Sequence, residues 1–284
     1  MSAMLPAMRE HYAHCEAEVR AGDKDRFLAA LFAPAVARPH LFALYAFDLE
    51  IGRIRARISE PLAGEIRLQW WRDALDGGGE AKGQPVAAAL LDTIERRSLA
   101  RRMFLGILDA RAFDLYDQPM PTLAALQTYA DATAGALLRL AARVLSGDDA
   151  PVAGAVAPAG RAFAYTGFLR ALALHASRRQ VFVPVEVLER HGAARADVVA
   201  GRTTPALLAA LNEMREQASA EHERARGLLR SAPAMAIPAF LPLALVPLYL
   251  ARMARPGYDP FRTAIEVPQW RRQWALWRAA QRRL

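Results

Sequence analysis

Hydrophobic side chains recur about every 3.6 residues along almost the whole chain, the spacing that places them on one face of an α-helix. Strand-like alternation of β-branched residues is confined to the short run VFVPVEV at 181–187. Helices are predicted over 3–20, 25–35, 38–57, 62–76, 84–97, 99–115, 121–146, 152–178, 184–191, 204–230, 240–254 and 266–282. Pro39 and Pro121 near predicted starts, and Gly77 after a predicted end, support these boundaries. The expected fold class is all-α.

The most apolar stretch, APAMAIPAFLPLALVPLYL at 232–250, carries no charge over about the length that a bilayer span requires. Its four prolines argue against a span, because each interior proline frees a carbonyl that lipid cannot hydrogen-bond. We predict buried core that begins as a loop and ends as a helix. No linker or internal repeat divides the chain, so one domain over 1–284 is expected, with a basic, tryptophan-rich helix at about 266–284.

Composition excludes several classes of protein. With 54% hydrophobic and 23% charged residues, the 284-residue chain is expected to fold around a large core rather than to be disordered. The formal charge of +8 comes from arginines scattered over the chain, and no nucleic-acid-binding module is present, so nucleic acid is not an expected partner. Cys15 is the single cysteine, which fits a reducing cytoplasm, and acidic residues interrupt any apolar secretion signal near the start.

Common catalytic motifs are absent from the sequence. It contains no G-x-G-x-x-G after a strand, no phosphate-binding G-x-x-x-x-G-K-[ST], no H-E-x-x-H and no G-x-S-x-G. His11, His14 and Cys15 lie close together in sequence, but no fourth ligand is evident, and an ordinary helix surface is the simpler interpretation. No metal site is predicted.

Two long segments resemble the motifs of a known family. They read RPHLFALYAFDLEIGRIRARISEPLAGEIRLQWWRDAL at 38–75 and GRAFAYTGFLRALALHASRRQVFVPVEVLERHG at 160–192, with support from DRFLAALF at 25–32 and YADATAGALLRL at 129–140. In order and spacing these segments resemble the squalene/phytoene synthase family over about residues 24–255. The resemblance implies an isoprenoid-synthase-type helical bundle around a central cavity.

The resemblance also implies where catalytic residues belong. In that family, paired aspartates on two facing helices hold Mg²⁺ ions that ionise a prenyl diphosphate. The corresponding positions are Gly52, Ala56, Ala171 and His175, so all four acidic anchors are missing. Asp48 and Glu50 are nearby but fall at other helical phases. We therefore expect no catalytic residue and no cofactor, with Mg²⁺ only if the chain is an active prenyltransferase.

The departures from the family pattern resemble a degenerate branch of the same superfamily, whose members assemble mitochondrial respiratory complex I. The shared positions are Glu50, Ser59, Glu60, Arg67, Gln69, Trp71, Leu169, Arg170, Ala171, His175, Ser177, Arg178 and Arg179. This branch implies a respiratory complex I subunit or assembly intermediate as the partner.

Candidate residues for a remodelled cavity or anion site follow from the same comparison. They are Tyr45, Glu50, Arg53, Gln69, Arg170, His175, Arg178 and Arg179. The arginines would grip a phosphate, or instead pair with Glu50, Glu60, Glu65 or Asp73. His175 would contact a ligand or serve as a satisfied structural histidine.

The C-terminal segment QWRRQWALWRAAQRRL at 269–284 carries Trp270, Trp274 and Trp277 on one helical stripe, with Arg271 and Arg278 beside it. A basic amphipathic helix of this kind suits an anionic membrane surface. The tryptophans would equally serve to dock the final helix on the bundle.

Three functions remain open. The first is a catalytically degenerate assembly or interaction factor for respiratory complex I, cytoplasmic and peripheral at the inner membrane. The second is a working head-to-head prenyl diphosphate transferase of the squalene or phytoene synthase type. The third is a non-catalytic protein that binds an isoprenoid or lipid.

Overall fold

A computed structural model describes residues 6–77 and 83–282, and in this part of the chain every regular element is helical. The all-α expectation is confirmed. Contacts divide the chain into two compact units. The first holds the described residues up to Leu115 together with Ala136–Val152 and Ala232–Phe240, and the second holds Tyr116–Gly135, Ala153–Ser231 and the chain from Leu241 onward. Each unit combines segments that are separate in sequence; the single domain over 1–284 stays a prediction.

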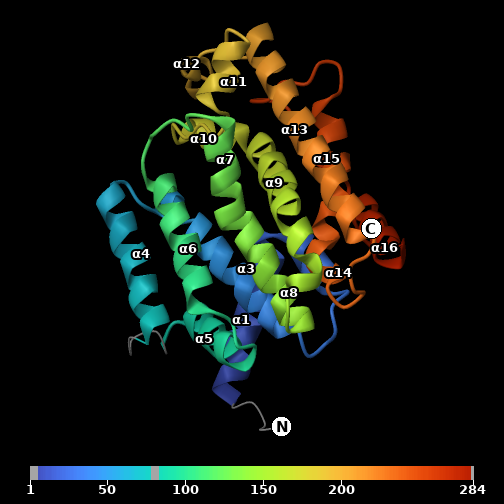
Figure 1. Cartoon of the computed structure of the whole chain (residues 1–284). Coiled ribbons are helices and arrows are strands. Elements are labelled where there is room, and N and C mark those ends of the chain that lie inside the picture. The colour runs from blue at the N-terminus through green and yellow to red at the C-terminus, as the bar shows by residue number, and fades with distance from the viewer. Residues whose placement is uncertain (1–5, 78–82, 283–284) are drawn as a thin grey trace. The chain divides into compact units, whose positions relative to one another are not determined.

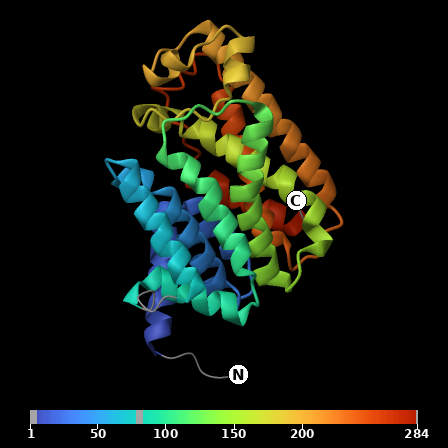
Figure 2. The same ribbon diagram turned by 60° about the vertical axis from the view of Figure 1, so that its left-hand side comes forward.

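The first unit is a group of short and medium helices. Its elements are α1 (Pro6–Gly22), α2 (Lys24–Ala30), α3 (Arg38–Gly52), η1 (Arg55–Arg57), α4 (Pro61–Asp76), α5 (Pro85–Arg96), α6 (Arg101–Arg111), η3 (Ala112–Leu115), α8 (Ala136–Ser146), η5 (Ala150–Val152) and α14 (Ile237–Phe240). Helix α3 is apolar on nearly every side because α1, α5 and α8 all pack against it, as the blue and cyan ribbons of Figure 2 show in part.

Aromatic side chains join three helices of the first unit. Phe47 of α3 meets the edge of Trp71 of α4 at a ring separation of 5.0 Å and the edge of Phe104 of α6 at 5.6 Å. All three side chains are fully buried. Edge-to-face pairs of large rings contribute beyond the area that they bury, so this trio stabilises the packing of α3, α4 and α6.

Cys15 of α1 also lies in the interior of the first unit. Its side chain is fully buried. Burial, with a smaller effect from the Glu50 carboxylate, raises the pKa of the thiol to about 12. The side chain is therefore a neutral, apolar part of the core at neutral pH.

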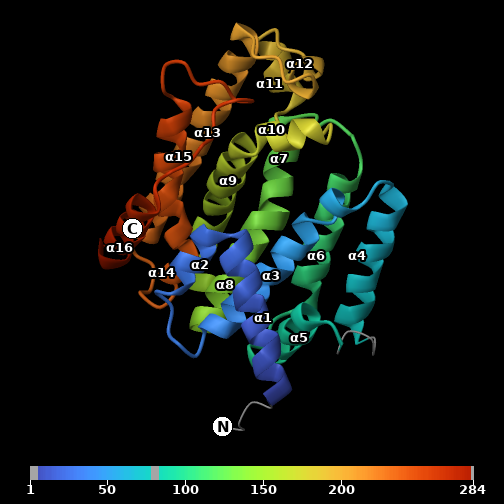
Figure 3. The same cartoon turned by 180° about the vertical axis from the view of Figure 1, so that it is seen from behind.

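The second unit is built around its longest helix. Its elements are α7 (Leu123–Ala130), η4 (Asp131–Gly135, a π-helical turn), α9 (Ala153–Arg170), α10 (Leu172–Ser177), α11 (Val185–Arg190), α12 (Arg195–Val199), α13 (Pro205–Leu229), η6 (Leu241–Leu245), α15 (Val246–Met253) and α16 (Gln269–Arg282). Helix α13 packs along α9, which is visible from both sides in Figures 1 and 3. Helix α13 begins at Pro205, which occupies the first helical position. The Thr204 hydroxyl caps this end by accepting a hydrogen bond of 3.1 Å from the Leu207 backbone amide.

Helix α9 passes very close to the π-helical turn η4. A Cβ atom added at Gly160 would lie 2.6 Å from the Cα and N atoms of Gly135, so only glycine fits there. Beside this crossing, Arg161 clamps Asp131 with two hydrogen bonds of 2.9 and 2.6 Å. Close backbone contact and a bidentate ion pair together fix η4 against α9.

Several predicted elements need correction. The helix expected over 38–57 ends at Gly52, the one expected over 121–146 contains the turn η4, and the one expected over 152–178 is interrupted at Ala171. Helix α12 was not predicted. Within the run 181–187, residues 181–184 form a loop and residues 185–187 begin α11. The start predicted at residue 3, and residues 283–284 of the predicted tail, lie outside the described residues.

Most of the apolar segment 232–250 forms buried core, as predicted, while residues 233–235 and 247 are exposed. It begins as a loop and continues as α14, η6 and α15, with residues 236–243 all buried. Across 6–77 and 83–282, no helix combines the length and hydropathy that a membrane crossing demands.

Candidate functional site

The first motif segment, 38–75, spans α3, η1 and α4 in the first unit, and the second, 160–192, runs from α9 through α10 to α11 in the second unit. The positions at which the family resemblance places aspartates have no carboxylate in either segment. Gly52 ends α3, Ala56 lies in η1, Ala171 sits at the break between α9 and α10, and His175 lies in α10.

Asp48 of α3 lies four residues before Gly52, about one helical turn, and two arginines enclose it. Its Oδ2 accepts a hydrogen bond of 2.7 Å from Arg26 of α2, and its Oδ1 accepts one of 3.1 Å from Arg111 of α6. Burial alone would raise the pKa of Asp48, but the two guanidinium groups more than offset it and hold that pKa below the usual range. Both carboxylate oxygens are thus committed to ion pairs. We call Arg26, Asp48 and Arg111 the arginine cage.

Two further acids adjoin the arginine cage. Asp23 lies 3.5 Å from the Arg26 guanidinium, and Asp114 lies 3.2 Å from that of Arg111. The predicted residue Tyr45 is also close, with its ring centre 5.4 Å from the guanidinium carbon of Arg26. Tyr45 is buried, which raises the pKa of its hydroxyl to about 12, with Arg26 opposing the shift. Tyr45 thus packs on the cage as a neutral aromatic ring.

Glu50 and Arg53 border a polar pocket of about 200 Å³ in the first unit. Glu50 accepts hydrogen bonds from Arg67 of α4 and, at 2.8 Å, from the Gln84 side chain at the start of α5. Arg53 donates to Glu18 of α1 at 3.0 Å. The sequence reasoning missed Glu18 and Gln84, because neither belongs to a motif. The pocket is a set of opposite charges that tie α1, α3, α4 and α5 together.

Gln69 does not join either group. It lies on the exposed side of α4, where its side-chain amide donates to Asp73 one helical turn away at 2.8 Å. This contact is local to α4.

His175 lies in an aromatic cluster of the second unit. Its ring meets Phe182 edge-on at 4.9 Å, and Phe182 stacks on Phe168 at 4.4 Å with the planes 7° apart. Tyr129 of α7 completes the cluster at 5.7 Å from Phe182. The cluster anchors the loop after α10 to α7 and α9.

The three predicted arginines of the second unit do not share one contact. The Arg170 guanidinium lies 3.6 Å from the centre of the Tyr249 ring, a cation–π contact with α15. Arg179 takes a left-handed backbone conformation with φ 60° and pairs with Asp117 at 3.6 Å, whereas Arg178 is half-buried at the end of α10. Arg53 belongs to the first unit, so the convergence of Arg53, Arg170 and Arg179 on one anion stays a prediction.

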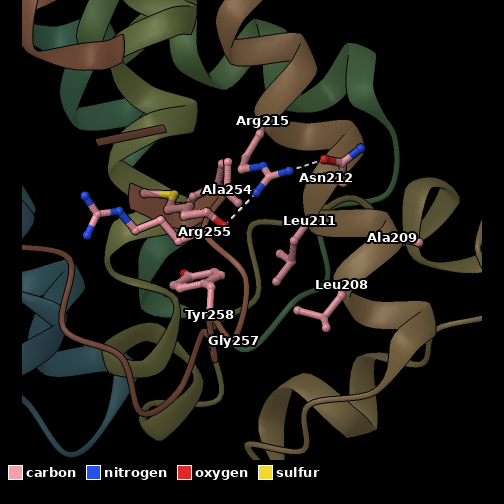
Figure 4. A pocket seen from close by; sticks show the side chains of 11 residues that line it. Leu208, Ala209, Leu211, Asn212, Arg215, Ala254, Arg255, Gly257 and Tyr258 are labelled. Carbon is pink, nitrogen blue, oxygen red and sulfur yellow. Dashed lines mark hydrogen bonds between the residues drawn. The ribbon is translucent and has the colours of Figure 1, made fainter. Parts of the chain in front are cut away.

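A cavity of about 420 Å³ opens between α13 and the segment that follows α15, and no sequence motif pointed to it (Figure 4). Leu208 and Leu211 of α13 and Tyr258 border its apolar part. Arg215 crosses one side, where it donates to the Met253 carbonyl at 2.6 Å and to the Asn212 side chain. Asn212 and Arg255 also line the cavity, so it offers polar as well as apolar contact.

The described residues contain no cluster of side chains that could bind a metal ion. Over residues 6–77 and 83–282, no three His, Cys, Asp or Glu side chains gather as metal ligands. His14 is exposed on α1 while Cys15 is buried, so the two do not present a common site.

The fold and the two motif segments define the class of protein. The sequence model of squalene/phytoene synthase matches residues 19–278, and the chain belongs to this family. The structure is similar to that of a dehydrosqualene synthase in complex with ligand, with a TM-score of 0.84, 18% identity and 96% of each chain covered. Squalene synthase HpnC from Alicyclobacillus acidocaldarius matches with a TM-score of 0.76 and 23% identity, over 91% of this chain and 98% of that one. These likenesses confirm the isoprenoid-synthase-type fold.

Particular relatives within the family are more informative. The chain is 30% identical over 267 residues to NADH dehydrogenase (ubiquinone) complex I, assembly factor 6, of Rattus norvegicus, covering 93% of this chain and 80% of the relative. The presqualene diphosphate synthase of Sinorhizobium fredii is 28% identical over 207 residues, covering 71% of this chain and 74% of the relative. The similarity to an assembly factor thus covers more of the chain than the similarity to this enzyme.

Proposed function

We propose that this protein is a non-catalytic assembly or interaction factor for respiratory complex I, acting at the cytoplasmic face of the inner membrane. Support for the partner comes from its likeness to complex I assembly factor 6 along 93% of its length. The arginine cage is the observation that carries the non-catalytic part. It commits Asp48, an acid within the first motif segment, to two structural ion pairs.

Mg²⁺, which the family resemblance implies, does not fit the residues present. The ion requires oxygen ligands, commonly carboxylates, in octahedral geometry. Gly52, Ala56 and Ala171 offer no side-chain oxygen, and both oxygens of Asp48 already accept from arginines. A Mg²⁺ ion beside Asp48 would also face the charges of Arg26 and Arg111. No ionisation step through the metal follows from these residues.

An in vitro assay tests the absence of catalysis. The purified chain, incubated with farnesyl or geranylgeranyl diphosphate and Mg²⁺ or Mn²⁺, is expected to form no C30 or C40 product. The presqualene diphosphate synthase of Sinorhizobium fredii, assayed in parallel, is the positive control. If the wild-type chain forms product and the Glu50→Gln variant does not, the proposal is overturned and the chain has a displaced active site.

A genetic experiment tests the partner. Deletion of the gene is expected to lower respiratory NADH oxidation and the amount of assembled complex I, while squalene, phytoene and hopanoid contents stay unchanged. Complementation by the wild-type chain should restore NADH oxidation. The opposite result, intact NADH oxidation with altered isoprenoid content, would favour the prenyltransferase.

Binding of an isoprenoid or lipid without turnover is a second candidate function, favoured by the partly apolar cavity of about 420 Å³. A site of this volume is within the range of small-molecule sites. Mass spectrometry of extracts from the purified protein would detect a retained lipid. Replacing Ala254 by Trp, which fills the cavity, should remove that lipid if it binds there.

A further inference from the structure

The C-terminal helix α16 turns its tryptophans away from the unit on which it packs. Trp270, Trp274 and Trp277 are 67%, 55% and 46% exposed. The helix instead packs through Leu276 and Ala279, which are buried, against η6. The interpretation in which the tryptophans dock this helix on the bundle is therefore wrong.

Helical geometry explains this arrangement. With about 100° per residue, the three tryptophans fall within roughly 60° of one another, whereas Leu276 and Ala279 fall on the opposite side. The rings of Trp274 and Trp277 stack at 5.0 Å with their planes 21° apart. The result is an aromatic stripe along the exposed side of α16, the red helix labelled in Figure 3.

Charge on α16 has one sign. The helix contains arginines and no acidic residue. Arg271 and Arg278 are exposed and lie on the flank of the tryptophan stripe, and the Arg271 guanidinium is 5.8 Å from the centre of the Trp270 ring. An aromatic stripe flanked by cations complements a surface that has apolar depth and negative charge.

We infer that α16 is an interfacial anchor for an anionic phospholipid membrane. The tryptophan rings would lie at the level of the head groups, where amphipathic rings are favoured, and Arg271 and Arg278 would contact lipid phosphates. The buried side of α16 keeps the helix attached to η6, so the anchor needs no refolding to bind. This inference deepens the proposed location at the membrane and does not depend on complex I.

Vesicle binding by the full chain tests the anchor. The protein should cosediment with vesicles of equal parts phosphatidylglycerol and phosphatidylcholine, bind phosphatidylcholine vesicles weakly, and dissociate as salt rises. Trp270→Ser/Trp274→Ser/Trp277→Ser should abolish binding with the melting temperature unchanged. Arg271→Gln/Arg278→Gln should weaken binding by about 25-fold, since each basic residue near the surface contributes about fivefold.

Matched controls separate a specific anchor from general stickiness. Leu62 and Ile66 of α4 are 66% and 64% exposed, so Leu62→Ser/Ile66→Ser removes comparable apolar surface elsewhere and should leave binding intact. Equal binding to neutral and anionic vesicles, or unchanged binding by the arginine variant, would overturn the anchor. If the wild type dimerises in the absence of vesicles and the tryptophan variant does not, a second copy of the chain, rather than a membrane, covers the tryptophan stripe. None of these results bears on NADH oxidation, so the assembly role is tested separately.

Discussion

Replacing Asp48 by Asn tests whether the arginine cage is a structural ion pair. The change keeps the shape of the side chain and removes the charge that Arg26 and Arg111 share. Loss of one partner from a buried ion pair costs about 3–5 kcal/mol of unfolding free energy. Arg26 keeps Asp23 at 3.5 Å and Arg111 keeps Asp114 at 3.2 Å, so neither guanidinium is left alone. We therefore expect Asp48→Asn to lower the unfolding free energy by about 3 kcal/mol, the lower end of this range.

Equilibrium urea unfolding, followed by circular dichroism, measures this loss. Asp109→Asn is the matched control, because Asp109 pairs with Arg72 at 2.9 Å while its side chain is 67% exposed. Breaking such a surface pair should cost less than about 1 kcal/mol. Equal unfolding free energies for the two variants would refute the structural role of the cage.

Acid unfolding gives the same prediction a second readout. The folded-state pKa of Asp48 lies below its usual range, because two guanidinium groups outweigh the effect of burial. The contribution of Asp48 to stability is therefore fully present above the unfolded-state pKa of about 3.9, and it is lost as the pH falls through the lower folded-state value. Asp48→Asn should lose less unfolding free energy than the wild type below about pH 4.

Two other substitutions test separate features of the units. Gly160→Ala should lower the unfolding free energy by about 1–2 kcal/mol, because overpacking against Gly135 outweighs the better helix propensity of alanine. Gly167→Ala, on the same helix with open space around it, should raise that free energy by about 0.5–1 kcal/mol, and a loss at both positions in urea unfolding would contradict the reasoning. Burial, with Arg97 nearby, lowers the pKa of His40 to about 4, so the wild type should lose stability as the pH falls from about 6.5 to 4. His40→Gln should reduce that loss in melting-temperature measurements and His14→Gln, on the exposed side of α1, should not; equal effects would refute the assignment to His40.

Local patterns predicted much of the helical architecture. The helix expected over 204–230 is α13, Pro205–Leu229, and the one expected over 84–97 is α5, Pro85–Arg96. The starts of both helices follow from features adjacent in sequence, such as the Thr204 cap of α13 and the proline near the first position of each helix. The π-helical turn η4 has no such signal, because its tight packing depends on Gly160, which is distant along the chain.

The candidate site shows the same division between local and distant causes. The sequence identified Asp48 as a nearby carboxylate, but its partners Arg26 and Arg111 are 22 and 63 positions away. Likewise, the arginines of the second motif were considered as partners for Glu50, whereas Glu50 pairs with Arg67 of α4. Among many arginines, spacing alone does not specify which one reaches a given carboxylate. The direction of the tryptophan stripe also required the packing of Leu276.

The burial of Cys15 makes the native chain suited to site-specific chemistry. Its thiol is fully buried, and burial raises its pKa to about 12, so the reactive thiolate is scarce at neutral pH. A cysteine introduced at exposed Gln273 of α16 would then be the one thiol that maleimide reagents readily modify. A photocrosslinker or spin label placed there could capture the neighbours of α16 in a native membrane extract, with no cysteine-free background to prepare.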